Sequence, residues 1–75
     1  MPKDEYDFAR VRLLRTLLDK VAEENYPSAT MMDTIEEIML PQELPVYAEL
    51  LMRHVEEDTY PSIDMINRLR NLQPM

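Results

Sequence analysis

Glycine and cysteine are both missing from this 75-residue sequence, and each absence excludes a kind of structure. Without cysteine no disulfide can staple the fold, which fits a chain that works in a reducing compartment. Without glycine, the breaks between regular elements fall to six prolines, and helix interiors avoid proline as well as glycine. The sequence therefore predicts helices that end at prolines.

Positive charge is scarce as well. Eight lysines and arginines stand against fifteen aspartates and glutamates, so the net charge is −7. A chain this acidic repels phosphate backbones and anionic membrane surfaces. Arg10, Arg12 and Arg15 crowd one segment, but Asp7 and Asp19 flank them. We expect no direct binding to nucleic acid and none to membranes.

Long apolar runs and a secretory signal are not seen either. The longest apolar stretches are a few residues, far short of the roughly 20 that span a bilayer. Residues 1–7 show no basic region followed by an apolar one, so we expect a cytoplasmic protein. A chain of this size buries only roughly 60% of its unfolded surface, which favours support from dense helix packing or from self-association.

Between the prolines, apolar residues recur at intervals of three and four, which is the period of an amphipathic helix. No segment alternates convincingly with period two, so no strand is expected. The sequence predicts an all-α fold with four helices. Their periodic positions are Val11, Leu14, Leu18 and Val21; Met31, Ile35, Ile38 and Met39; Tyr47, Leu50, Leu51, His54 and Val55; and Met65, Ile66, Leu69 and Leu72.

Both halves of the sequence share one pattern: two leucines, a pair of glutamates, the tripeptide Tyr-Pro-Ser and then a methionine. The period of about 34 residues is the length of one helical hairpin. We predict a single domain over residues 1–75, a compact four-helix bundle of two duplicated helical hairpins related by a pseudo-twofold axis. Repeat one spans about 8–40 and repeat two about 41–75. The matched residues are Leu17, Leu18, Glu23, Glu24, Tyr26, Pro27, Ser28 and Met31 in the first, and Leu50, Leu51, Glu56, Glu57, Tyr60, Pro61, Ser62 and Met65 in the second.

The repeated Tyr-Pro-Ser is explained as a hinge. Proline forces the residue before it to be extended, so the preceding helix must end by Tyr26 and by Tyr60. Ser28 and Ser62 then stand where a helix N-cap accepts a backbone N–H. We expect each tyrosine ring to lie over its joint. A motif bound by a partner, or a phosphorylation site, is the alternative. The hinge residues are Tyr26, Pro27, Ser28, Tyr60, Pro61 and Ser62.

Two known families share parts of this pattern. The period resembles that of tetratricopeptide repeats, but those need small residues at helix crossings and about three units or more, and this chain has no glycine. The stretch from Asp33 to Met39 is similar to the recognition helix of acyl carrier proteins. In that family a serine directly after an aspartate carries the phosphopantetheine, whereas Met31 and Met32 stand in its place here. Neither family's function is therefore expected.

His54 is the only histidine, and it lies on the apolar side of the predicted third helix, beside Leu50 and Leu51. A nucleophilic triad needs a histidine next to a serine or cysteine. Di-metal bundles need Glu-x-x-His motifs, whereas Leu51 stands three residues before His54. We predict a core-edge position for His54, no enzymatic activity, and no cofactor or metal.

The first helix has more apolar positions than one inward stripe needs, which predicts an exposed face that forms a homodimer or a partner groove. Methionines suit adaptable contacts. The glutamate pairs oppose the helix dipole; they are either a solvated face or an acidic rim for a basic partner. The candidate partner-binding residues are Leu13, Leu17, Met31, Met39, Glu23, Glu24, Glu56 and Glu57.

We therefore predict a small acidic protein–protein interaction module or adaptor that forms a homodimer and has no catalytic activity. The alternative is an acidic neutralising protein, such as an antitoxin, an immunity protein or a phage-type inhibitor. Such a protein would block a basic nucleic-acid-binding surface of its target, and electrostatic steering would make the complex sensitive to salt.

Overall fold

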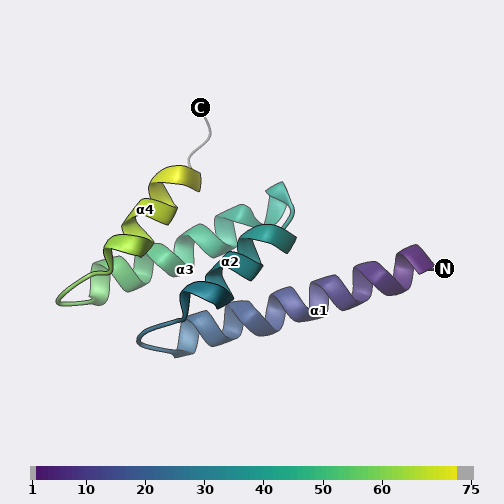
Figure 1. Ribbon diagram of the computed structural model, residues 1–75, viewed down its shortest axis with the longest axis horizontal. Coiled ribbons are helices and arrows are strands. Elements are labelled where there is room, and N and C mark those ends of the chain that lie inside the picture. Colours follow the sequence, from purple (N-terminus) through teal and green to yellow (C-terminus); the bar gives the residue numbers. More distant parts are fainter. Residues whose placement is uncertain (1, 73–75) are drawn as a thin grey trace. The chain divides into compact units, whose positions relative to one another are not determined.

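A computed structural model of the chain describes the backbone of residues 2–72 and the side chains of residues 7–72. Within that range every regular element is helical and there is no strand, so the predicted all-α class with four helices is confirmed (Figure 1). The elements are α1 (Pro2–Glu23), α2 (Ala29–Ile38), the short 3-10 helix η1 (Pro41–Glu43), α3 (Leu44–Glu57) and α4 (Ile63–Leu72).

The prolines explain where these helices begin and end. α1 and α3 both stop before the Tyr-Pro-Ser segments, which proline keeps extended. Pro41 is the first residue of η1. The last residue of η1, Glu43, accepts a hydrogen bond at a carboxylate oxygen from the backbone N–H of Leu40 at 2.6 Å. Pro45 is the second residue of α3, where its missing N–H has no helical partner to lose.

The chain divides between Met39 and Leu40 into two compact units. α1 and α2 form hairpin one, and α3 and α4, preceded by η1, form hairpin two. Each hairpin is described by itself below. The single domain, the four-helix bundle and the pseudo-twofold axis stay predictions.

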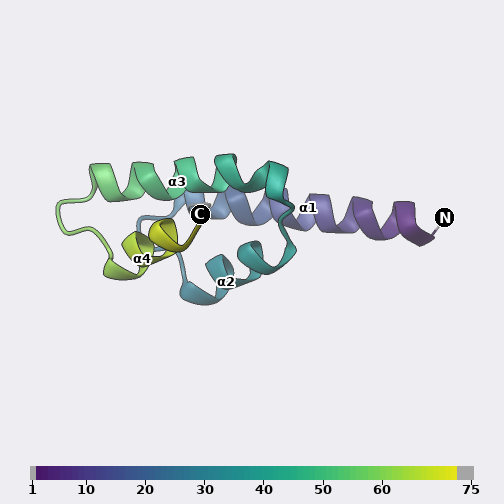
Figure 2. The ribbon, with the colours of Figure 1, turned by 90° about the horizontal axis from the view of Figure 1, so that it is seen from above.

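In hairpin one, α2 packs against the C-terminal part of α1. Leu14 and Val21 are buried, and they lie seven residues apart on one side of α1. They meet Met32 and Ile35, the buried residues of α2. α1 has 22 residues and α2 has 10, so the N-terminal part of α1 extends past α2, as Figures 1 and 2 show.

Arg10 fixes the end of α2 against α1. Its Nη1 donates to the carbonyl oxygen of Ile38 at 2.9 Å, while its Nε lies 3.6 Å from a carboxylate oxygen of Asp7. A cation at this carbonyl is favourable because the C-terminus of a helix carries partial negative charge. Arg10 therefore marks the level on α1 at which hairpin one closes.

Hairpin two has a core of the same size. Tyr47 and Leu51 of α3 are fully buried, and Met65 and Leu69 of α4 pack with them; each pair is spaced by four residues, which places both members on one helix face. His54 is half-buried in the last turn of α3, a core-edge position.

The two hairpins do not bury every matched residue alike. Ile35 and its counterpart Leu69 are both buried, but Met31 is half-buried whereas its counterpart Met65 is buried. Met32, the next residue, takes the buried place in hairpin one. α2 and α4 therefore do not bury the same set of matched positions in their hairpins.

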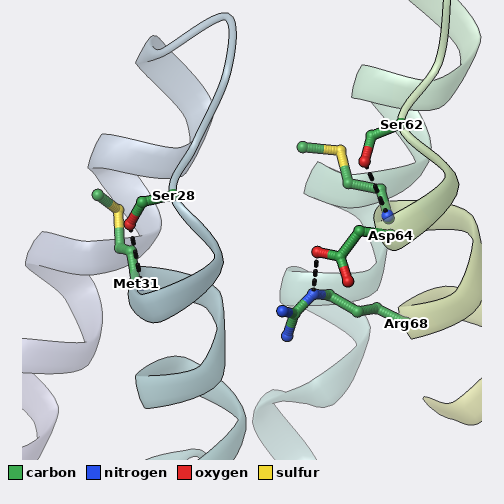
Figure 3. Close-up of polar contacts among 6 residues, drawn as sticks. Ser28, Met31, Ser62, Asp64 and Arg68 are labelled. Atoms are coloured by element: carbon green, nitrogen blue, oxygen red, sulfur yellow. Dashed lines mark hydrogen bonds and ion pairs between the residues drawn. The ribbon is translucent and has the colours of Figure 1, made fainter.

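Both hinge serines make the same hydrogen bond. The hydroxyl of Ser28 accepts from the backbone N–H of Met31 at 3.0 Å, and that of Ser62 accepts from the backbone N–H of Met65 at 3.2 Å (Figure 3). Each bond satisfies one of the N–H groups that a helix N-terminus leaves without a partner. α4 is supported further by Asp64, whose carboxylate accepts from Nε of Arg68 one turn on, at 2.8 Å (Figure 3).

The hinge tyrosines behave otherwise than expected. Tyr26 is 87% exposed and Tyr60 is 89% exposed, so the expectation that each ring covers its joint is wrong. Pro27 is buried in hairpin one, and Pro61 is half-buried in hairpin two. The proline and the serine account for the hinge, and the tyrosine contributes no packing to it.

We expect Ser28→Ala and Ser62→Ala each to lower the free energy of unfolding by about 1 kcal/mol, because each removes an N-cap. Tyr26→Ala in the same hinge should change it by less than about 0.5 kcal/mol, because the ring is exposed. Urea unfolding followed by circular dichroism measures all three. A Tyr26→Ala variant as unstable as Ser28→Ala would mean that the ring packs in solution.

Candidate protein-interaction surface

The side of α1 that faces away from α2 carries an open groove of about 480 Å³. Leu14 and Val21 point to α2, and helical periodicity places the groove residues on the other side of the helix. We call this surface the α1 groove. Its lining residues are Phe8, Val11, Arg12, Arg15, Thr16 and Asp19.

The apolar part of the α1 groove lies at its N-terminal end. Phe8 is 66% exposed, and Val11, three residues on, is also exposed. An aromatic side chain buries roughly 150–250 Å² when it is fully covered, and 66% of Phe8 is still exposed. Covering this ring with a partner would therefore be favourable, because it removes apolar surface from water.

The charged part of the α1 groove changes sign along the helix. Arg12 and Arg15 come first, and Asp19 follows them; Glu23 continues the same side at the end of α1. No ion pair within residues 7–72 involves Arg12, Arg15 or Asp19.

Other arginines of the chain do have carboxylate partners within it. They are Arg10 with Asp7, Arg53 with Glu49 at 3.7 Å, and Arg68 with Asp64. The charged side chains of the α1 groove are thus available to form ion pairs with groups outside hairpin one.

A second hollow, of about 210 Å³, lies on the other flank of α1, where Leu13 and Ala9 approach Ile38 at the end of α2. Leu13 is 46% exposed, whereas Leu17, one turn on, is half-buried. Of the two leucines singled out from the sequence, Leu13 is therefore the one that faces outward. Met31 and Met39 of the same hairpin are half-buried.

All four glutamates of the acidic pairs are exposed. Glu23 and Glu57 are the last residues of α1 and α3, Glu56 precedes Glu57, and Glu24 follows α1 with its N–H bonded to the carbonyl of Lys20 at 3.0 Å. Each pair therefore stands at the tip of its own hairpin, a few residues before an exposed tyrosine.

From the sequence, Val11 was counted in the apolar stripe of the first helix, but neither Val11 nor Phe8 was singled out as a site. The missed signal is the order of charges around them. Arginines at positions 12 and 15 and acids at positions 19 and 23 fall on one side of a helix at spacings of three and four. Such spacing predicts a helix face that is basic toward its N-terminus and acidic toward its C-terminus.

Within residues 7–72 no three histidine, cysteine, aspartate or glutamate side chains gather closely enough to hold a metal ion. No helix in the described part of the chain is both long enough and apolar enough to cross a membrane. No protein-family model, curated protein or solved structure matches the sequence. The function must therefore be inferred from the surfaces of the chain itself.

Proposed function

We propose that this protein is a small acidic interaction module of the cytoplasm, without catalytic activity or cofactor, that binds protein through α1 and forms a homodimer. One observation carries the proposal. α1 exposes Phe8 and Val11 beside arginines that have no carboxylate partner in residues 7–72. Aromatic residues and arginine are both enriched in protein interfaces relative to the rest of the surface.

We further propose that the flank with Leu13 is covered within the chain. Leu13 and Leu17 lie four residues apart on one face of α1, and the hollow joins that face to Ile38. Met31 lies seven residues before Ile38 on α2 and continues the surface. Packing hairpin two on this apolar face would complete the four-helix bundle and leave the α1 groove for a partner.

The experiment that tests the function replaces the exposed ring. Phe8→Glu should keep the helical circular dichroism of the wild type, because the ring is exposed, and should sediment as a monomer where the wild type is a dimer. Putting a charge at the centre of an apolar contact opposes association. Analytical ultracentrifugation over a range of concentrations measures this.

The matched control is Ile63→Glu, because Ile63 is 70% exposed at the start of α4. It should leave the sedimentation of the dimer unchanged. A wild-type protein that stays monomeric at high micromolar concentration, and brings no partner out of lysate, would overturn the proposed function.

A second function is favoured by the hairpin tips. Each tip presents a pair of exposed glutamates and an exposed tyrosine, which suits a basic, arginine-bearing surface. This is the neutralising protein that would occupy a nucleic-acid-binding surface. The two functions differ in what disrupts the complex: one made by the tips should weaken strongly as salt rises and survive Phe8→Glu, whereas one centred on Phe8 should be lost in that variant.

A further inference from the structure

We propose that the partner of the α1 groove is the same groove of a second copy, with the two α1 helices antiparallel and their charges interlocked. This inference rests on the proposed function, since it takes α1 as the binding surface, and it goes further by fixing the orientation and the residues that specify it.

The order of charges selects the antiparallel orientation. The first half of the α1 groove carries Arg12 and Arg15 and its second half carries Asp19; Glu23 follows on α1 just beyond the groove. Antiparallel helices place the first half of each copy against the second half of the other, so that each basic half meets an acidic one. Parallel helices would place arginine against arginine and acid against acid, which disfavours association.

A twofold axis at the level of Leu17 makes the pairing specific. Residues equally far from Leu17 then lie opposite each other, so that Arg15 of one copy meets Asp19 of the other. Arg12 comes opposite Ala22, where the small side chain leaves room for the guanidinium to reach Glu23 next to it. The symmetry of a closed dimer repeats each contact.

The same register places the exposed aromatic groups together. Phe8 lies nine residues before Leu17 in the sequence, and Tyr26 lies nine residues after it. Phe8 of one copy therefore comes opposite the hinge of the other, where Tyr26 is almost fully exposed. A contact between the two rings would cover the two aromatic side chains that are exposed within residues 7–39.

Hairpin two of the same chain is the competing occupant, and the charges favour a second copy instead. Hairpin two offers a poorer match to the acidic end of the α1 groove, because two of its three arginines, Arg53 and Arg68, already lie against Glu49 and Asp64. α1 itself holds the required pattern in reverse order. A self-complementary surface is the kind that a twofold dimer uses.

Three variants test the orientation. The first-half variant carries Arg12→Glu and Arg15→Glu, the second-half variant carries Asp19→Lys and Glu23→Lys, and the swapped variant carries all four changes. Each half variant alone opposes like charges in the antiparallel dimer, so its dissociation constant should rise by at least about tenfold. The swapped variant restores opposite charges and should dimerise nearly as well as the wild type.

The control carries Arg53→Glu and Arg70→Glu, which changes the net charge as much as the first-half variant does but at exposed arginines of hairpin two. It should dimerise like the wild type. Sedimentation equilibrium at fixed ionic strength gives the dissociation constants, and circular dichroism shows that every variant stays folded.

The outcomes separate this inference from the function beneath it. A wild-type monomer removes the proposed self-association and this inference with it. If Phe8→Glu dissociates the wild-type dimer but the half variants keep their affinity, α1 still forms the interface and the proposed charge pairing is wrong. A swapped variant that fails to recover overturns the antiparallel orientation. If the wild type is a monomer and the half variants are monomers of lowered stability, the α1 groove is covered by hairpin two of the same chain.

Discussion

Ile35→Ala should lower the free energy of unfolding by about 2–5 kcal/mol, the range that removing a large buried aliphatic side chain costs. Ile35 is fully buried between α1 and α2. A small scaffold without disulfides or metals draws only about 3–5 kcal/mol from its core. The variant should therefore be largely unfolded at room temperature, as the loss of helical circular dichroism will show.

Ile63→Ala is the matched control, because it makes the same substitution at a site that is 70% exposed. The free energy of unfolding should change by less than about 0.5 kcal/mol, as for most surface substitutions. Urea titration of both variants gives the comparison directly. Equal losses in the two variants would mean that the core of hairpin one does not include Ile35.

The helix ends were predictable because proline acts through local geometry. Proline disfavours the helical conformation of the residue before it, so α1 and α3 were expected to end before Pro27 and Pro61. The preference is not absolute, because Leu44 is helical although Pro45 follows it. The bond made by Ser28 is local in the same sense, since it joins residues three apart. Such features need no knowledge of the rest of the fold.

The exposure of the hinge tyrosines was not predictable in this way. Whether Tyr26 covers its joint depends on how the two helices pack around it, and in this hinge the buried residue is Pro27. Leu13 and Leu17 likewise both belong to the apolar stripe of α1, and only the position of α2 decides that Leu13 is the more exposed. Tertiary packing sets these details, because periodicity assigns a residue to a face without saying what covers it.

The α1 groove lay partly within reach of sequence reasoning. The surplus of apolar positions on the first helix predicted an exposed face, but the prediction pointed to Leu13 and Leu17. Phe8 is the more exposed side chain, and its neighbours Arg12 and Arg15 line the groove with it. From the sequence, Arg12 and Arg15 were considered only as a possible nucleic-acid-binding patch, although arginine is also enriched in protein interfaces.

Separate peptides covering residues 1–39 and 40–75 should each lose most of their helix in dilute solution and recover it when mixed. The division between Met39 and Leu40 gives each peptide one whole hairpin. Within residues 7–72 each hairpin buries only four large apolar side chains well, and chains below about 40 residues rarely hold a fold alone. α2 and α4 have 10 residues each, fewer than the roughly 12–15 that an isolated helix needs.

The recovery on mixing follows from the proposed four-helix bundle, in which the face with Leu13 and Ile38 is covered by hairpin two. Circular dichroism of each peptide and of the equimolar mixture measures it, at a concentration below that of α1 self-association, so that a second copy cannot substitute for the missing hairpin. Peptide 1–39 carrying Ile35→Ala is the control and should not recover. A wild-type 1–39 peptide that is helical and melts cooperatively by itself would show that hairpin one folds independently, because its core would then suffice without hairpin two.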